Sequence, residues 1–414
     1  MIQRCKGFKD MLPQEMADFR KVESAFLQTA SGWGYQEVRT PSIEYLYLFT
    51  SAGTLTPGKL RRTYSFLDWD GWSGERVVLR PDATIPVTRM YSECMAESAQ
   101  ARLCYIANTF MFDDTGKKNR ERWQMGAEFI GSSSALADGE LVAVAMEVVN
   151  RLGIPDVRVR LSHSGLIAAL LEQSGFEADE YNSIFDELLD GNESAIEKVK
   201  EANPQLARLF SLMLGMQGKS TEYLKNLRAL LDEALSGAKC VIDDFIAVTE
   251  AIQTLGVECE INLAAAKGYE YYTGIIFHIL SGEEIIGGGG RYDNLVGLLG
   301  GKEIPAAGFG LYMDQMIKLS MCKKPDKAQE QVLMVKTPSG STSSALELAR
   351  LLRENGFGVI LESEGCENAG SRFSIDVTEA PRDYMLLDSV TGKRLHASSA
   401  QELCTALAKG VEFA

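Results

Sequence analysis

Four consecutive glycines, Gly287 to Gly290, stand in the stretch IIGGGGRYDNLVGLLGG at residues 285–301. Glycine allows unusual backbone angles and leaves room for another backbone or a ligand to approach closely. A phosphate-binding P-loop ends in Gly-Lys-Ser or Gly-Lys-Thr, which this stretch lacks, and the dinucleotide spacing G-x-G-x-x-G is never completed. From these residues alone, two interpretations stay open: a strand or hairpin with special backbone angles, or a surface that a second molecule approaches.

The length and composition predict a soluble protein of two or three domains. The chain has 414 residues, of which 45% are hydrophobic and 24% are charged, an ordinary globular composition. It contains no apolar run long enough to span a bilayer, and its first residues turn polar too early for a secretory signal. We therefore expect a cytoplasmic location and no membrane. The net charge of −15 argues against non-specific nucleic-acid binding.

The cysteines and histidines do not form a recognisable metal or disulfide motif. The eight cysteines are scattered without a CxxC pair, so neither a disulfide framework nor a zinc ribbon is expected. The histidines at His163, His278 and His396 are far apart in the sequence. We predict reduced thiols, structural histidines, no metal and no cofactor.

Hydrophobic periodicity divides the chain into a large core and a small C-terminal domain. We expect the core at 1–319, with a helical insertion at about 164–256. A polar linker is expected at 320–330, because this segment carries a proline and many charges. Residues 331–414 alternate between strand and helix patterns, which predicts a small α/β domain.

Within the core, the pattern predicts both helices and an antiparallel sheet. Helices are expected at 13–31, 84–98 and 138–152, and four strand-like runs lie between 63 and 130. A further strand around Val38 is stopped by Pro41. The expected fold class is therefore α+β.

Seven stretches of the chain resemble the class II aminoacyl-tRNA synthetase core, and specifically the histidyl-tRNA synthetase family. They occur in one order with compatible spacing: KGFKDMLP (6–13), EVRTPSIEY (37–45), LRPDAT (79–84), RERWQMGAEFIGS (120–132), KGYEYYTG (267–274), GGGRYD (288–293) and PAAGFGLYMDQM (305–316). The resemblance implies an antiparallel sheet flanked by helices. It also implies a homodimer formed through the segment that ends at Pro41.

The resemblance further implies a pocket for the amino acid histidine. Asp82 stands where the family's carboxylate holds the ligand's ammonium group, beside Thr84. Gln124 and Glu128 match a polar pair on the next strand, and side chains four residues apart on a strand point to the same face. Lys267 replaces the family's arginine in RGLDYY and would hold the ligand's carboxylate.

Aromatic rings and glycines complete this implied pocket. Tyr271 and Tyr272 match the family's double tyrosine, and Tyr292 follows the loop of Gly288, Gly289 and Gly290. The rings would enclose the imidazole. Each residue also has a plain structural alternative. Asp82 and Thr84 could cap a helix, the tyrosines could be sheet aromatics, and Glu128 could pair with a neighbouring arginine.

Two positions that carry phosphate-clamping arginines in the family carry other residues here. Met111 stands in the motif 2 stretch Phe110–Asp113, and Gln315 stands in motif 3. Loss of one preorganised donor costs about 3–4 kcal/mol in the transition state. We therefore predict that adenylation is lost, that no residue is catalytic, and that histidine binding remains.

The C-terminal domain also departs from the tRNA-binding pattern. Residues 331–414 contain 8 Lys and Arg against 11 Asp and Glu, a net of −3, and the acidic stretch ESEGCENAGSRFSIDVTEAPRD replaces the expected basic helix. We expect no tRNA surface. A histidine-binding, synthetase-like chain of this kind resembles the ATP phosphoribosyltransferase regulatory subunit family. That resemblance implies a non-catalytic subunit, in a hetero-oligomer with a short-form ATP phosphoribosyltransferase catalytic subunit.

Two alternatives stay open at this point. One is a divergent histidyl-tRNA synthetase that draws its phosphate-binding cations from Lys117, Lys118 or Arg120. The other is a stand-alone histidine-sensing protein.

Overall fold

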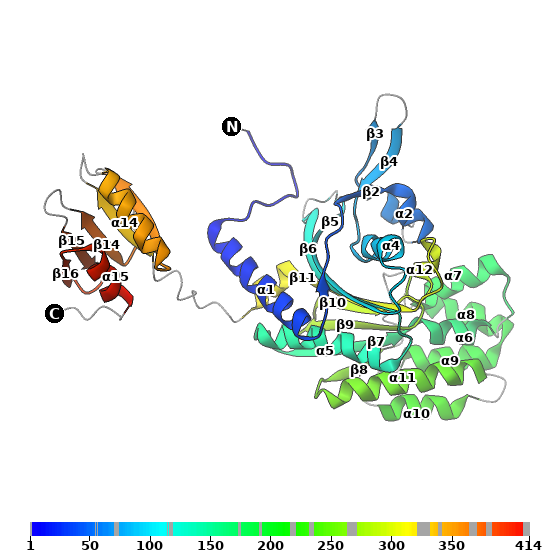
Figure 1. Cartoon of the computed structure of the whole chain (residues 1–414). Helices are drawn as coiled ribbons and strands as arrows, with labels where there is room; N and C mark the ends of the chain where they lie inside the picture. Colours follow the sequence, from blue (N-terminus) through cyan, green and yellow to red (C-terminus); the bar gives the residue numbers. More distant parts are fainter. Residues whose placement is uncertain are drawn as a thin grey trace. The chain divides into compact units, whose positions relative to one another are not determined.

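The structure, a computed structural model, forms two compact units, Met1–Cys322 and Lys323–Ala414. Each unit is described by itself (Figure 1). The described residues are 2–53, 55, 57–69, 74–113, 115, 119–172, 175–189, 193–215, 221–231, 236–262, 271–320, 332–337, 342–363, 371–377 and 383–408.

An eight-stranded sheet in the order β1-β5-β6-β11-β10-β9-β7-β8 forms the centre of the large unit. Its strands are β1 (Gln36–Glu37), β5 (Ala101–Phe110), β6 (Glu121–Ile130), β11 (Ala306–Tyr312), β10 (Glu284–Arg291), β9 (Ile275–Ser281), β7 (Val157–His163) and β8 (Cys259–Ile261). The central strands pair in antiparallel fashion, as predicted, whereas β1–β5 and β7–β8 are parallel pairs at the two edges. Parallel neighbours need a long crossover, and the helical insertion supplies it between β7 and β8.

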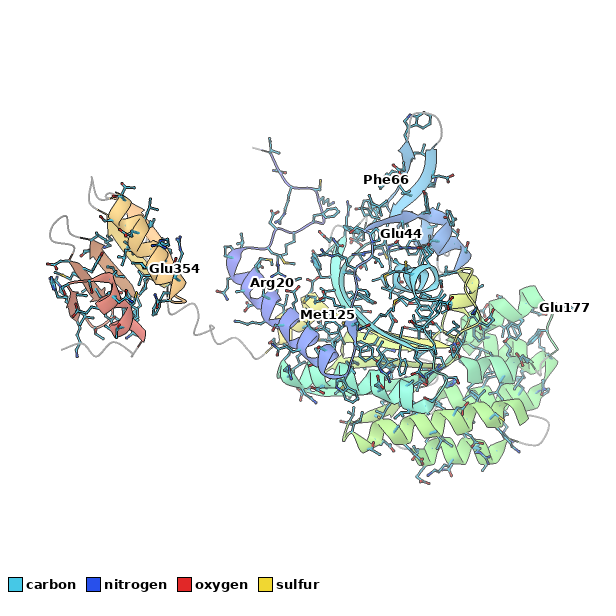
Figure 2. The ribbon with its side chains drawn as sticks, in the orientation of Figure 1. Arg20, Glu44, Phe66, Met125, Glu177 and Glu354 are labelled. Carbon is cyan, nitrogen blue, oxygen red and sulfur yellow. The ribbon has the colours of Figure 1, made fainter. Side chains whose placement is uncertain are left out.

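Helices cover one face of this sheet. They are α1 (Pro13–Gly32), α5 (Ala135–Arg151) and α13 (Met313–Leu319). The apolar stripe of α1, including Phe19 and Phe26, packs in one core with Met125 at the centre of β6 (Figure 2). Met125 is fully buried. The opposite face of the sheet carries a second apolar core, which includes Leu103 and Ile130.

The predicted helical insertion is present and forms a bundle beside the β7 and β8 end of the sheet (Figure 1). Its helices are α6 (Ser164–Leu171), α7 (Ala178–Leu189), α8 (Glu193–Ala202), α9 (Pro204–Gly215), α10 (Thr221–Leu230) and α11 (Ser236–Thr254). Helix α11 packs on α5, and Phe245 and Ile252 of α11 are fully buried. The bundle therefore continues the core of the sheet.

A separate three-stranded sheet corrects one expectation. We expected the runs between 63 and 130 to share one sheet, but β2 (Ile43–Tyr45), β4 (Gly74–Leu79) and β3 (Ser65–Trp69) pair among themselves. Strand β1 ends at Glu37, the N–H of Val38 makes one more hydrogen bond to the carbonyl of Cys104, and the chain then passes through Pro41 into β2. The β3–β4 hairpin projects from the rest of the unit, with Phe66 on it (Figures 1 and 2). Short helices accompany this sheet: α2 (Leu46–Ser51), α3 (Pro57–Leu60), α4 (Thr84–Cys94) and α12 (Leu295–Leu298).

The small unit holds a five-stranded sheet in the order β13-β12-β14-β15-β16. Its elements are β12 (Val332–Thr337), α14 (Thr342–Glu354), β13 (Gly358–Ser363), β14 (Phe373–Val377), β15 (Tyr384–Asp388), β16 (Arg394–Ala397) and α15 (Ala400–Ala408). The sequence prediction missed β14 and β16, which are short and lie among polar residues. Beyond residue 320, the predicted linker lies outside the described residues.

The four glycines lie inside the central strand β10, in agreement with the strand interpretation, and Gly288, Gly289 and Gly290 do not form the loop named above. None of them has a positive φ, so special backbone angles do not explain them. A Cβ on Gly289 would lie 2.2 Å from the carbonyl oxygen of Gly308 and 2.7 Å from Cζ of Phe277. The glycines are needed because neighbouring atoms of the sheet approach too closely for a side chain.

Substitution of Gly289 should therefore destabilise the fold. We expect Gly289→Ala to lower the free energy of unfolding by about 1–3 kcal/mol, because overpacking forces the two strands apart. Gly237→Ala is the matched control, since this glycine lies in α11 with nothing within 4 Å of its Cβ position. It should leave stability unchanged or raise it by up to about 1 kcal/mol. Urea unfolding measures both, and equal midpoints would contradict the close approach.

Candidate functional site

A pocket lies on the sheet face opposite the helices. Its lining residues come from the start of α4, from β6, β10 and β11, and from the turn before β9: Asp82, Thr84, Gln124, Tyr271, Tyr272, Gly288, Gly308, Phe309, Gly310 and Tyr312. Gly288 pairs with Gly310 across the two strands. This row of glycines makes the floor of the pocket bare backbone.

Polar side chains of the neighbouring strand β6 occupy the space that the glycines of β11 leave free. A Cβ on Gly308 would lie 1.6 Å from Oε2 of Glu128, and one on Gly310 would lie 2.1 Å from Nε2 of Gln124. The register explains this contact, because Glu128 is paired directly with Gly308. Gly289 points to the other face, toward Phe277. The glycines of β11 therefore make room for the protein's own polar groups.

Glu128 is completely buried at the edge of this pocket. Its Oε2 accepts a hydrogen bond from the Tyr292 hydroxyl. Its Oε1 has no hydrogen-bond partner among the described residues. Burial raises the pKa of Glu128 to about 8, and the hydroxyl groups of Tyr292, Thr84 and Tyr105 offset only part of that effect. A buried oxygen without a donor is costly, so this atom is suited to a donor from a ligand.

Tyr105 belongs to the same polar network, and sequence reasoning missed it. Its ring lies over Gly126, where a Cβ would meet the tyrosine oxygen at 2.3 Å. Its hydroxyl accepts from Nε2 of Gln124 at 3.1 Å and lies 3.5 Å from Oγ1 of Thr84. The pairing of Tyr105 with Gly126 on adjacent strands was the one available signal, and it depends on a register that the sequence does not give.

Asp82 has two roles at once. Its Oδ1 accepts from the backbone N–H of Ile85 at 2.9 Å, which caps the first turn of α4. Its Oδ2 accepts from the Tyr271 hydroxyl at 3.5 Å, at the pocket. Burial raises the pKa of Asp82, and the Ile85 N–H partly counters this. The capping alternative and the pocket position are therefore compatible.

The three tyrosines cluster as the sequence prediction expected, but they take different places. The ring centroids of Tyr271 and Tyr272 are 5.0 Å apart, and those of Tyr271 and Tyr292 are 5.7 Å apart. Tyr271 and Tyr272 line the pocket. Tyr292 is fully buried behind Glu128, so it supports the carboxyl group instead of lining the pocket.

The two predicted clamp positions are not among the residues that line this pocket. Met111 follows β5 and Gln315 lies in α13, and neither is among the lining residues. Arg120, offered above as a substitute cation, donates twice to the carbonyl of Asp113, at 3.0 and 2.7 Å, and its guanidinium stacks on Phe112 at 4.2 Å. Lys117, Lys118 and Lys267 lie outside the described residues.

The described residues contain neither a membrane-spanning helix nor a metal site. None of the described helices has the length and hydropathy to cross a membrane. Within the same part of the chain, His, Cys, Asp and Glu side chains form no group suited to a metal ion.

Comparison with known proteins agrees with the fold. The family described as histidyl-tRNA synthetase matches residues 7–316. A solved structure described as an ATP phosphoribosyltransferase regulatory subunit/histidyl-tRNA synthetase from Bacillus halodurans aligns with a TM-score of 0.77 at 24% identity, over 89% of this chain and 95% of the other. The apo histidyl-tRNA synthetase of S. aureus aligns at 0.70 and 20% identity, over 99% of each chain. The predicted fold class, that of the class II aminoacyl-tRNA synthetases, is confirmed.

Sequence relatives narrow the assignment. The ATP phosphoribosyltransferase regulatory subunit of Dehalococcoides mccartyi is 46% identical over 403 residues, which is 97% of this chain and 98% of the relative. The histidine–tRNA ligase of Archaeoglobus fulgidus is 32% identical over 88% of this chain and 86% of the relative. The chain belongs to the histidyl-tRNA synthetase-like family of ATP phosphoribosyltransferase regulatory subunits.

The buried Glu128 should give the unliganded protein a distinctive pH dependence. Its pKa is about 8 in the folded chain against an ordinary 4.5, so between these values the folded state binds more protons than the unfolded state. Stability should therefore fall as the pH rises from about 5 to 8. Glu128→Gln should remove this component, which is at most about 1.4 kcal/mol per pH unit.

Urea unfolding at several pH values, for the native chain and the variant, provides the measurement. Other groups, such as Asp138 with a pKa raised to about 6 by burial, are common to both proteins and cancel in the difference. Parallel pH curves would rule out a buried, proton-binding Glu128.

Proposed function

We propose that this chain is a non-catalytic regulatory subunit of ATP phosphoribosyltransferase, which binds histidine and controls the first step of histidine biosynthesis. One observation carries the proposal. Asp82, Thr84 and Gln124 line one pocket, and the buried carboxyl group of Glu128 lies against Gly308 in its floor. The clamp positions carry Met111 and Gln315. The ligand site is kept and the cations needed for ATP chemistry are replaced.

The pocket chemistry suits histidine. Asp82 accepts from the ligand's ammonium group, and Lys267 pairs with its carboxylate. The imidazole lies among Tyr271, Tyr272 and Gln124 and donates an N–H to Glu128. A donor there satisfies a buried oxygen that has no partner among the described residues, and charge on the ligand favours the ionised form of Glu128. Histidine controls the assembly by binding one of its states more tightly than the other.

The proposed partners are a short-form catalytic subunit and a second copy of this chain. The relatives named above as regulatory subunits support the first. The surface after Pro41 supports the second: the side chains of Ile43, Tyr45 and Tyr47 are 48%, 43% and 61% exposed, and the two tyrosine rings stack at 5.2 Å. Exposed apolar groups gathered in this way are typical of protein contacts. The acidic C-terminal domain argues against a tRNA partner.

A second candidate is a working histidyl-tRNA synthetase, favoured by the 32% identity to a histidine–tRNA ligase. It requires cations at the phosphates. The Arg120 guanidinium is committed to the carbonyl of Asp113 and to the ring of Phe112, so the regulatory function is the better supported of the two.

Histidine binding is the first test. Isothermal titration calorimetry with L-histidine should detect one site per chain, and Glu128→Ala should abolish the heat while the chain stays folded by circular dichroism. Glu140→Ala is the matched control, because Glu140 pairs with Arg102 away from the pocket and should leave the affinity unchanged. Binding by Glu128→Ala with native affinity would refute the role of this carboxyl.

The absence of adenylation is the second test. We expect no histidine-dependent ATP–pyrophosphate exchange above background, because two clamp positions lack a cation and each lost donor costs about 3–4 kcal/mol. The Archaeoglobus fulgidus ligase serves as the active control. Robust exchange by this chain would overturn the regulatory assignment in favour of the synthetase.

A further inference from the structure

We propose that Arg80 is a positioning residue that ties the ligand pocket to the segment ending at Pro41. Through its guanidinium, histidine binding and the pairing of two copies of this chain are linked. The proposal rests on the proposed function for its ligand and for its second copy.

The guanidinium of Arg80 binds two separate parts of the chain. Its side chain is nearly inaccessible, at 4% exposure. On one side, Nη1 donates to the carbonyl oxygens of Thr40 at 2.9 Å and Pro41 at 3.1 Å, and to the Thr40 hydroxyl at 3.1 Å. On the other side, Nε and Nη2 donate to the carbonyl and side-chain oxygens of Asn108 in β5, at 2.7 and 3.0 Å.

Through these acceptors, Arg80 holds the 40–41 segment and β5 in a fixed relative position; we call this set of hydrogen bonds the Arg80 clamp. Among the described residues, the acceptors of the Arg80 guanidinium are carbonyl, amide and hydroxyl oxygens. Burying a charged group is costly unless its donors are satisfied. The planar fork satisfies them only when the 40–41 segment and β5 keep this arrangement. The backbone N–H of Arg80 adds a hydrogen bond to the carbonyl of Ser42 at 3.0 Å.

The clamp is adjacent to the pocket along the chain. Pro81, whose φ is fixed by its ring, follows Arg80 and leads directly to Asp82. Asp82 caps α4 and contacts Tyr271, and Thr84 begins α4 beside Tyr105. A shift of Arg80 therefore moves the Asp82 carboxylate, which has few independent ways to adjust.

The clamp is also adjacent to the exposed apolar surface. Thr40 to Ser42 lead directly into Ile43, and the side chains of Tyr45 and Tyr47 follow. A second copy that packs on this surface restrains residues 40–42. Because Arg80 is hydrogen-bonded to these residues, its position, and with it that of Asp82, is restrained as well. Such a linkage is reciprocal, so histidine must strengthen self-association by the same factor.

A double-mutant cycle with Arg80→Lys and Tyr47→Glu tests the link. Lysine keeps the charge but loses the fork, and glutamate at a 61% exposed position opposes pairing without touching the pocket. Each single variant should weaken histidine affinity about tenfold in calorimetry. The double variant should be no weaker than Arg80→Lys alone, because both changes break the same connection. Sedimentation velocity should report that histidine promotes self-association in the native chain only.

Two control variants separate this link from general destabilisation. Arg102→Lys alters a guanidinium that pairs with Glu140 and stacks on Phe129, and Leu230→Glu alters a 58% exposed side chain on α10. Both should leave affinity and association unchanged. If Arg80→Lys does not fold, Thr40→Val replaces it, removes one acceptor with the same shape, and should weaken binding about threefold.

Additive effects, or native histidine affinity in Tyr47→Glu, would overturn the link. A native chain that binds histidine but stays monomeric with and without it would overturn it as well. Absence of histidine binding in the native chain would instead overturn the proposed function. The two failures are therefore distinguishable.

Discussion

The burial of Glu128 against the Tyr292 hydroxyl is the interaction on which the site depends. A carboxyl group can lie inside the sheet only if the adjacent strand offers no side chain, and Gly308 meets that requirement. It also needs a fixed donor. Tyr292 supplies it because Arg291 anchors the end of β10 with a hydrogen bond of 2.8 Å to Asp138 and another of 2.8 Å to the carbonyl of Ser132. The burial of Glu128 therefore depends both on the glycines of the adjacent strand and on the hydrogen bonds that fix Arg291.

In the proposed function, this arrangement separates ligand recognition from chemistry. Two arginines next to pocket residues in the chain or the fold, Arg80 and Arg291, are buried and bound to the protein itself. They hold the shape of the site and are not free to bind phosphates. A pocket that binds a ligand without transforming it can bind that ligand more tightly in one state of an assembly than in the other. The binding energy then shifts the equilibrium between the two states. In a synthetase, binding energy must instead favour the transition state, which is why loss of clamping cations matters there.

Helices and central strands could be predicted from local pattern because their apolar periodicity is clear. The apolar stripe of α1 and the alternation in β5 and β6 are examples. The division of the strands between two sheets could not be predicted, because β3 and β4 have the same alternation as strands of the large sheet. Their separation depends on where the chain turns after Pro41. The short strands β14 and β16 were missed because polar and charged residues flank each of them, although β14 itself alternates Phe373, Ile375 and Val377.

The site residues were predicted by resemblance, and most of them do meet at one pocket: Asp82, Thr84, Gln124, Tyr271, Tyr272 and Gly288 line it. Tyr105 was missed, and Tyr292 and Gly289 lie on sides of the sheet that pattern alone does not define. A shift of register by one residue moves a side chain to the other face. Only the paired strands determine which glycine faces the pocket and which faces Phe277.

The sequence by itself determined the chemical inventory of this protein: a preserved set of acids, amides and tyrosines, and missing arginines at Met111 and Gln315. It also determined the order of the helices and of most strands, since these follow from local periodicity. The tertiary structure alone decided what the glycines are for. Distances across β10 and β11 show that their lack of side chains accommodates Glu128, Gln124 and Phe277. Contacts between strands distant in sequence set these distances, and no local pattern encodes them.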